Sequence, residues 1–451
     1  MNNIPTETDS FALRAQQRRR FIIHSIINGF RSAHWSKKSK MTFWAFTVFS
    51  LLILAAKTPI CNFFYDPPLS GIFDTLFPIL YVVFALPALF VVAFFLGSPK
   101  GSWEMYRNLM RAGFVNSAKE APIMTARLDS PDKIHSTFMF ETCGLPVDFW
   151  QDNIPALESA LNYTIIKIEQ GKNKRFVILE VLPGDMKLPD KVDWSWDKMP
   201  KESSVLLIGE SLIGSETVDL NVIPHILIGG STGSGKTVLV KCLAAQCMQQ
   251  GAEVIIADFK GVDFYNLFWM ASVSRLCLDL RTLFVALNDI LDQLEYRVQR
   301  FQDTHHSCMD EYNEKENGNL KRIVFVCDEI SELLDKKGRS KEEKETIDKI
   351  IGMLSKIARQ GRTFGINLIL ATQRPDADVL PGQIKNNMDY RVCGRADNTL
   401  SMIILDTADA NDAVPKDKCG RFINNSGTIL QAYYFCDDML FIRPPATKDG
   451  E

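Results

Sequence analysis

The residues best suited to chemistry lie in one glycine-rich segment of the chain. The segment Gly230-Ser-Thr-Gly-Ser-Gly-Lys-Thr237 has the Walker A spacing G-x-x-x-x-G-K-[ST]. Its glycines let backbone N–H groups close around phosphate oxygens at the start of a helix. We expect Lys236 to reach the β- and γ-phosphates of ATP, and Thr237 to be a ligand of Mg²⁺. The predicted nucleotide-binding residues of this loop are Gly230, Ser231, Thr232, Gly233, Ser234, Gly235, Lys236 and Thr237.

A second apolar run ends in two carboxylates. The segment Arg322-Ile-Val-Phe-Val-Cys-Asp-Glu329 predicts a buried strand that delivers Asp328 and Glu329 to the same site, as a Walker B element. Asp328 would bind the nucleotide through Mg²⁺, and Glu329 would polarise the attacking water as general base. The alternative is a strand that merely ends in two solvated acids, and the phosphate loop argues against it.

Two further strands fit the same sheet, at residues 253–258 and 367–372. Gln373 follows the second strand, where a strand end would face the γ-phosphate, so we predict that it senses hydrolysis. Arg359 and Arg362 lie at the end of a helix predicted between Ser340 and Gly361. They are either partners of the helix dipole or, with Arg362 preferred, an arginine finger that reaches ATP on a neighbouring subunit. The predicted catalytic residues are Lys236, Glu329, Gln373 and Arg362.

Strands that alternate with helices predict an α/β fold with a mainly parallel sheet for residues 201–451. Residues 98–200 predict a membrane-proximal segment and a small α+β module. Its strands are expected in Phe138–Glu141, Thr164–Ile168 and Arg175–Val181, and a short helix in Asp152–Asn162.

Residues 41–97 predict two transmembrane helices joined by a short external loop. The 22 residues from Leu76 to Gly97 carry no charge and would form a helix of about 33 Å, enough for a hydrocarbon core of about 30 Å. The run from Met41 to Ala56 is shorter, about 24 Å, and spans only if Lys57 reaches the interface. Its alternative is an interfacial or signal-like segment.

Basic residues flank both predicted spans. Residues 1–40 form a basic segment, and Lys100, Arg107 and Arg111 follow the second span. This distribution predicts a multi-pass protein of the cell membrane with both termini in the cytoplasm. The basic segment either only sets this topology or also binds anionic lipid.

The composition excludes several classes of protein. With 46% hydrophobic and 23% charged residues the chain is globular rather than disordered or collagenous. A net charge of -3 excludes nucleic-acid binding by bulk positive charge, although a local basic surface could bind it. The ten cysteines include no Cys-x-x-Cys pair, so neither a disulfide framework nor a zinc site is expected.

The chain from about residue 121 to residue 440 resembles the FtsK/SpoIIIE DNA translocases, a group related to conjugative coupling proteins. Besides the Walker motifs, the resemblance rests on Asp258-Phe-Lys260, Tyr312-Asn-Glu-Lys315, Gly361-Arg362, Ala371-Thr-Gln-Arg-Pro375, Ile384-Lys-Asn-Asn387 and Ile404-Leu-Asp406. It implies a RecA-like P-loop ATPase domain that assembles as a homo-oligomer, a hexameric ring around DNA, and pumps the DNA by hydrolysing ATP. Residues 121–189 look like the α/β module that precedes the motor in that family.

The sequence also departs from the chromosome translocases of that family. Met402 stands where many of them have an arginine shortly before Leu-Asp, so the resemblance does not extend to that nucleotide contact. We also expect the winged-helix domain that reads chromosome polarity to be absent. Two predicted spans and no long linker make the chain more similar to coupling proteins of Gram-positive conjugative elements.

The leading hypothesis is a membrane-anchored, ATP-driven DNA translocase that acts as a coupling protein in conjugative transfer. Its partners would be DNA, a relaxase or other relaxosome protein, and components of the mating channel. The alternatives are a chromosome-partitioning translocase, the ATPase of a type VII-like protein secretion system, and a docking protein that binds nucleotide without hydrolysing it.

Overall fold

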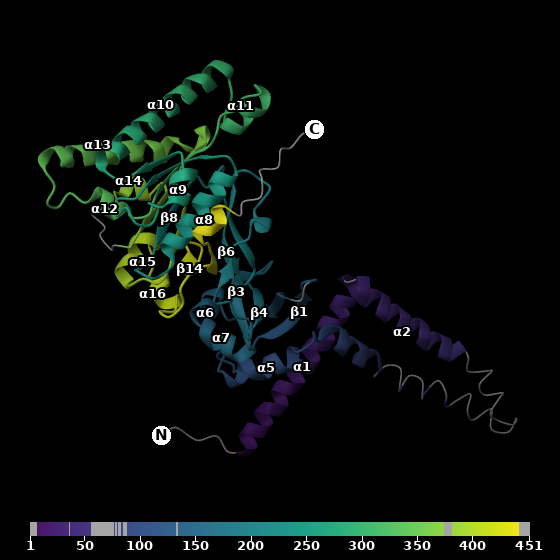
Figure 1. The fold of residues 1–451 in the computed structure, drawn as a ribbon. Helices are drawn as coiled ribbons and strands as arrows, with labels where there is room; N and C mark the ends of the chain where they lie inside the picture. The colour runs from purple at the N-terminus through teal and green to yellow at the C-terminus, as the bar shows by residue number, and fades with distance from the viewer. Residues whose placement is uncertain are drawn as a thin grey trace. The chain divides into compact units, whose positions relative to one another are not determined.

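The computed structural model describes residues 7–35, 37–55, 88–131, 134–373 and 381–441, together with residues 76, 79 and 83 (Figure 1). The chain divides into two compact units, Met1–Met186 and Lys187–Glu451.

The first unit contains a four-stranded antiparallel sheet in the order β1-β2-β4-β3. The strands are β1 (Ile123–Asp129), β2 (Ser136–Glu141), β3 (Tyr163–Gln170) and β4 (Phe176–Pro183). The sheet packs with the helices α5 (Ser102–Arg111), α6 (Val147–Asp152) and α7 (Ile154–Leu161), around a core that includes Phe138, Phe140 and Trp150. The three predicted strands are confirmed. The predicted helix at 152–162 is confirmed as α7, and the chain turns at Asn153 between it and α6, which was not predicted.

Two long helices precede this module, α1 (Glu7–Trp35) and α2 (Lys37–Ala55). In α1, Phe21 is buried against Phe94, Trp103 and Tyr106. Gly29 crosses helical residues 88–97 so closely that a Cβ atom would lie 1.7 Å from the carbonyl oxygen of Ala93.

The prediction of two transmembrane helices is not supported by the described residues. None of the helices in the described ranges is both long and apolar enough to cross a membrane. The helix α2 covers nearly all of the first predicted span, but it begins with three lysines, Lys37, Lys38 and Lys40. Part of the second predicted span, Leu76–Gly97, lies outside the described residues.

The second unit is built on one large mixed sheet in the order β10-β9-β11-β12-β8-β13-β14-β15-β6-β7, with β5 paired to β15. Neighbouring strands are parallel from β10 to β13 and antiparallel from β13 to β7, so the prediction of a mainly parallel sheet holds for the half that carries the motifs. The strands are β5 (Val192–Asp193), β6 (Val205–Ser211), β7 (Gly214–Asp219), β8 (His225–Gly229), β9 (Glu253–Ala257), β10 (Arg275–Cys277), β11 (Ile323–Cys327), β12 (Ile366–Thr372), β13 (Tyr390–Cys393), β14 (Arg421–Asn424) and β15 (Ile429–Tyr434).

Helices cover both faces of this sheet (Figure 1). Side chains alternate along β8, so Ile226 and Ile228 join the core under one face and Leu227 joins the core under the other. The first core contains α8 (Lys236–Gln249) and α9 (Leu267–Ser272). The second contains α10 (Leu280–Thr304), α12 (Ile330–Leu334), α13 (Lys341–Gln360), α14 (Gly382–Lys385), α15 (Asn398–Leu405) and α16 (Asp409–Ala413). Cover on both faces explains why β8, β11 and β12 are continuous apolar runs.

Candidate active site

The phosphate loop joins the end of β8 to the start of α8. Gly233 and Gly235 have φ angles of 78° and 95°, in the left-handed region that favours glycine. A Cβ atom on Gly235 would lie 2.9 Å from the backbone nitrogen of Gly420, so the loop also runs too close to a neighbouring segment for a larger residue. The helix α8 starts at Lys236, which places its N-terminal N–H groups at the loop, as the sequence predicted.

Asp328 joins the two Walker motifs. Its Oδ1 accepts a hydrogen bond of 2.8 Å from Lys236 Nζ, and its Oδ2 accepts one of 2.9 Å from the Thr237 hydroxyl. The side chains of Lys236 and Asp328 are each only 4% exposed, so this is a buried ion pair. Thr237 and Asp328 present the hard oxygen atoms that Mg²⁺ prefers, and Lys236 presents the charge that phosphate needs. The residues therefore fit ATP with Mg²⁺.

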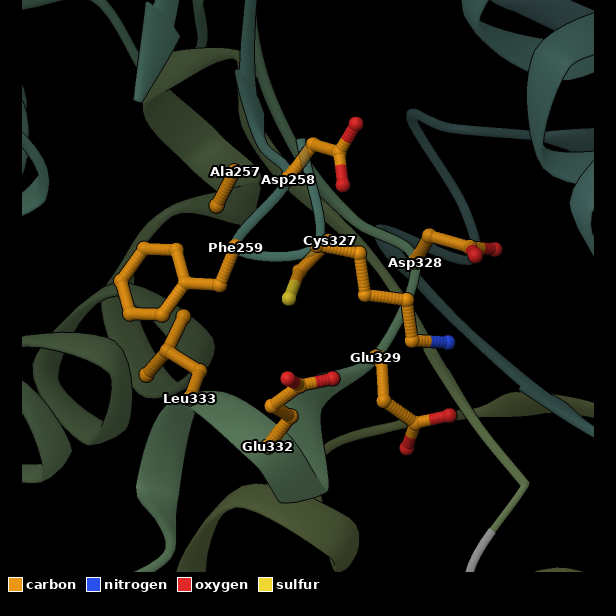
Figure 2. Close-up of a pocket in the computed structure, with 9 residues that line it drawn as sticks. Ala257, Asp258, Phe259, Cys327, Asp328, Glu329, Glu332 and Leu333 are labelled. Carbon is orange, nitrogen blue, oxygen red and sulfur yellow. The ribbon is translucent and has the colours of Figure 1, made fainter. Parts of the chain in front are cut away.

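Glu329 is held by groups from two elements. Its carboxylate accepts hydrogen bonds from the Thr372 hydroxyl at 3.0 Å and from the Gln373 backbone N–H at 3.1 Å, both at the end of β12. It also accepts one from the Ser331 hydroxyl in α12. Figure 2 shows the side chains of Asp328 and Glu329 pointing in different directions, and their hydrogen bonds accordingly reach the phosphate loop from Asp328 and the end of β12 from Glu329. Adjacent residues of one strand end can thus serve a metal ion and a water molecule separately.

Gln373 reaches the phosphate loop directly. Its side-chain Oε1 accepts a hydrogen bond of 2.8 Å from the Thr232 hydroxyl, while its backbone N–H is bonded to Glu329. One residue thus contacts both the loop and the predicted general base. The structure therefore brings together all of the predicted site residues except Arg362.

A small cavity between the ends of β9 and β11 adds further carboxylates near the site. It is lined by Asp258, Asp328, Glu329 and Glu332 among others (Figure 2). Burial raises the pKa of nearby Asp263, and the charges of Asp328 and Asp258 raise it further. The described residues contain no group of three or more such side chains arranged to bind a metal ion by themselves. Mg²⁺ would be held by few protein ligands together with phosphate and water, as is usual for this ion.

Arg395 was missed by sequence reasoning, although it holds the phosphate loop. Its guanidinium donates to the carbonyl of Thr232 at 2.5 Å, to the hydroxyl of Ser231 at 3.2 Å and to the carbonyl of Lys416 at 2.8 Å. Its own carbonyl accepts from the Ser231 backbone N–H at 2.7 Å. Arg395 follows β13, and β13 pairs with β8, the strand that leads into the phosphate loop. Its position after a strand of the same sheet is the feature that could have indicated its role.

Arg362 lies far from the phosphate loop, at the end of the sheet where the parallel strands begin. We call this end the amino edge of the sheet, and we call the end where the parallel strands finish, at the phosphate loop, the carboxyl edge. Arg362 follows α13 and precedes β12, whose seven residues span about 23 Å before the chain reaches Gln373. Its Nε donates to the carbonyl of Asn221 at 3.0 Å, and Nε of Arg359 donates to the carbonyl of Ser355 at 3.2 Å. Arg362 therefore cannot act on the nucleotide of its own subunit.

Comparison with known proteins agrees with this geometry. A model described as the FtsK/SpoIIIE family matches residues 191–377. A solved structure of the pCW3 conjugation coupling protein TcpA, in monomer form with ATPγS, is 35% identical with a TM-score of 0.57, and the match covers 76% of this chain and 98% of that chain. The chain belongs to the FtsK/SpoIIIE family.

Curated relatives in the FtsK/SpoIIIE family are named DNA translocase FtsK. The protein from Helicobacter pylori strain J99 is 30% identical over 213 residues, which are 45% of this chain and 24% of that protein. The protein from Lactococcus lactis subsp. lactis is 31% identical over 270 residues, which are 54% of this chain and 34% of that protein. The chain thus matches only a quarter to a third of the length of these relatives. The family prediction made from the sequence motifs is confirmed.

Proposed function

We propose that this chain hydrolyses ATP to move DNA, as a coupling protein in conjugative transfer. The observation that carries the proposal is the bonded group of Lys236, Thr237 and Asp328 beside a separately held Glu329. The family relatives named DNA translocase FtsK support DNA as the cargo. The similarity to TcpA, a conjugation coupling protein, supports transfer between cells and, with it, relaxosome and mating-channel partners.

Each residue of the site has a defined task in this proposal. The backbone N–H groups of the loop and Lys236 bind the phosphates, and Thr237 and Asp328 hold Mg²⁺. Bound Mg²⁺ neutralises charge on the phosphate oxygens. Glu329 takes a proton from the attacking water, and Gln373 connects that carboxylate to the loop. Lys236 and Thr237 both donate hydrogen bonds to Asp328. When ATP binds, Lys236 would exchange Asp328 for phosphate, and Thr237 and Asp328 would exchange each other for Mg²⁺.

We further propose that the chain forms a ring of identical subunits, in which Arg362 completes the site of its neighbour. Its exposed position, at the edge of the sheet remote from its own loop, supports a role across an interface. Arg362→Ala should lower hydrolysis about 10³-fold and leave nucleotide affinity little changed, because the finger acts on transition-state charge. Arg359→Ala, one turn away, is the matched control and should stay near the parental rate.

Mixed rings test this arrangement. An Arg362→Ala subunit keeps an intact phosphate loop, and a Lys236→Ala subunit keeps an intact finger. Mixing the two inactive proteins should therefore restore part of the hydrolysis. No recovery at any mixing ratio would contradict action across an interface.

We also propose that residues 1–97 anchor the chain in the cell membrane with both termini in the cytoplasm. The helix α2 has large apolar side chains that are strongly exposed, including Trp44 at 63% and Phe49 at 61%, and Phe95 is 72% exposed. Exposed apolar surface of this kind needs a lipid or protein partner. The full chain should remain in membranes after carbonate extraction. Release into the carbonate supernatant would contradict anchoring.

DNA binding and DNA-stimulated hydrolysis by the full chain test the proposed function itself. A translocase must grip phosphates rather than bases, since base contacts would break at every step. We expect little preference between origin-of-transfer and scrambled duplexes, and a steep loss of affinity between about 50 and 200 mM salt. A preference for the origin of about a hundredfold would contradict the idea that a partner selects the DNA. Hydrolysis that does not respond to DNA would contradict DNA as the cargo.

A further inference from the structure

His225, the first residue of β8, connects two elements at the amino edge of the large sheet. Its side chain is fully buried. Nδ1 accepts a hydrogen bond of 3.0 Å from the backbone N–H of Leu368 in β12, and Nε2 lies 3.1 Å from the carbonyl oxygen of Ala358 in α13. Burial lowers the pKa of His225 to about 4, so the ring is neutral at pH 7. A neutral ring has one acceptor and one donor, and both are used here, with Nε2 donating to Ala358.

The carbonyl that His225 binds lies at the base of the turn that carries Arg362. Ala358 is in the last turn of α13, where carbonyl groups lack donors within the helix. The chain then turns tightly, because the Gly361 backbone N–H donates to Ile357 at 2.7 Å and the Gly361 carbonyl accepts from Ile366 at 3.0 Å. A Cβ atom on Gly361 would lie 2.3 Å from the carbonyl oxygen of Ile366, so only glycine fits.

Side chains from other elements hold the same turn from its other sides. Arg297 of α10 donates to the carbonyl of Phe364 at 2.5 Å and to the carbonyl of Lys321 at 2.7 Å. The carbonyl of Asn221 accepts from Arg362 Nε. An exposed arginine side chain ordinarily samples many rotamers. For Arg362, hydrogen bonds hold both the backbone of the turn and the Nε group of the side chain. His225 is the member of this group that also belongs to the phosphate-loop strand.

We propose that His225 is a positioning residue that couples the phosphate loop of a subunit to the arginine which that subunit presents to its neighbour. The proposal rests on the proposed role of Arg362 across the interface. The strand β8 is five residues long, fully buried, and bonded to β12 and β13, and it leads directly into Gly230. Such a strand moves as a unit, so a shift of the loop on nucleotide binding reaches the ring of His225 and, through Ala358, the turn of Arg362. Nucleotide binding in one subunit thereby changes the position of its Arg362 at the site of the neighbouring subunit. The subunits of the ring would then hydrolyse ATP one after another.

Two substitutions separate the contacts of His225. Asparagine is short: it can keep an acceptor for Leu368 N–H but cannot reach Ala358. Glutamine is longer and keeps a donor near the Ala358 carbonyl. We expect His225→Asn to lower hydrolysis at saturating ATP on the order of tenfold, the effect of one lost hydrogen bond, with nucleotide affinity unchanged within about twofold. We expect His225→Gln to stay within about threefold of the parent. Ser355→Ala is the control, since this buried hydroxyl of α13 has no hydrogen-bond partner and its loss should change nothing.

The decisive measurement is the same substitution in an Arg362→Ala background. If His225 acts through Arg362, the double variant hydrolyses ATP no more slowly than Arg362→Ala alone. A further tenfold loss in the double variant would overturn the proposal, because His225 would then act locally. Should His225→Asn fail to fold, His225→Gln carries the test: a folded glutamine variant with a tenfold loss that persists without Arg362 overturns it as well. A parental rate for Arg362→Ala alone would instead contradict the finger, so the two failures are distinguishable.

Discussion

Buried charged side chains have different kinds of partner at the carboxyl edge and at the amino edge of the large sheet. At the carboxyl edge, the ammonium group of Lys236 bonds the carboxylate and the carbonyl of Asp328, and Glu329 bonds hydroxyl and N–H groups of β12 and α12. At the amino edge, the guanidinium of Arg322 bonds the side-chain oxygens of Asn367 at 2.7 Å and Asn221 at 2.5 Å. Arg297 bonds two backbone carbonyls. Neither of these buried arginines has a carboxylate within ion-pair distance among the described residues.

Because of this difference, charged groups at the carboxyl edge can exchange their partners for ligands, whereas those at the amino edge keep theirs. Mg²⁺ and phosphate can replace the partners of Asp328 and Lys236 because they offer the same charges. Nothing in solution replaces the oxygens around Arg322 and Arg297, which belong to the strands and turns themselves. Burial accordingly lowers the pKa of Arg322, and that of Arg297 to about 10. Substitutions of Lys236 or Glu329 should therefore change chemistry, and substitutions that remove an oxygen partner of Arg322 or Arg297 should change stability.

The largest effect is expected at the carboxyl edge. Lys236→Ala should remove ATP binding because it deletes the charge that compensates phosphate, and hydrolysis should be lost with it. Glu329→Gln should keep ATP affinity and lower turnover by about 10²- to 10⁴-fold, because only water activation is lost. Binding of a fluorescent ATP analogue and steady-state hydrolysis measure the two effects. Turnover of Glu329→Gln near the parental rate would show that another group is the base.

Removing a hydrogen-bond partner of Arg322 at the amino edge should lower the free energy of unfolding. Asn367→Leu keeps nearly the same volume but leaves Arg322 without one of its acceptors, and the carbonyls of Leu220 and Pro224 without their donor. We expect the free energy of unfolding to fall by about 3–5 kcal/mol. Thr232→Val, which removes an exposed hydrogen bond to Gln373 at the other edge, should change it by about 0.5 kcal/mol or less. Urea unfolding of both variants measures this contrast, and equal losses would remove the distinction between the edges.

The sequence predicted the carboxyl edge far better than the amino edge. Walker A is contiguous in sequence, and each of β9, β11 and β12 is a mainly apolar run that leads into a polar residue, Asp258, Asp328 or Gln373. The contacts of Asn221, Arg322 and Asn367 join segments up to 147 positions apart, and no local spacing predicts them.

The antiparallel half of the sheet was missed for a related reason. The strand β6 pairs with β15 across more than two hundred residues, and both are short strands without a motif. The charge-free runs of the first hundred residues indicated hydrophobicity correctly, but the described helices do not reach the length and apolarity of a span.

Acid should weaken the amino edge through His225. The native ring takes up a proton only near pH 4, whereas the ring in the unfolded chain does so near pH 6.5. Between these values the unfolded chain binds more protons, so the stability that the neutral ring contributes is complete above about pH 6.5 and is lost as the pH falls toward 4. The loss should be about 2 kcal/mol at pH 5. His225→Asn should lack this part of the pH dependence, and equal pH dependence of parent and variant in urea unfolding would exclude the ring as its source.

A smaller effect than that of acid is expected for Arg395, which lies at the carboxyl edge but bonds backbone oxygens as Arg297 does. It holds the carbonyls of Thr232 and Lys416 and the hydroxyl of Ser231, so it orders the loop before nucleotide arrives. Arg395→Gln removes both this order and a positive charge beside the phosphates, and should weaken ATP binding by roughly tenfold, about 1.4 kcal/mol. Arg395→Lys keeps the charge but not the planar set of donors, so its loss should be only a few-fold. Equilibrium binding at two salt concentrations separates the contributions, because the charge effect weakens with salt and the ordering effect does not. Equal losses for both substitutions at both salt concentrations would mean that Arg395 acts through loop geometry alone, and unchanged affinity for both would mean that the phosphate loop is ordered without it.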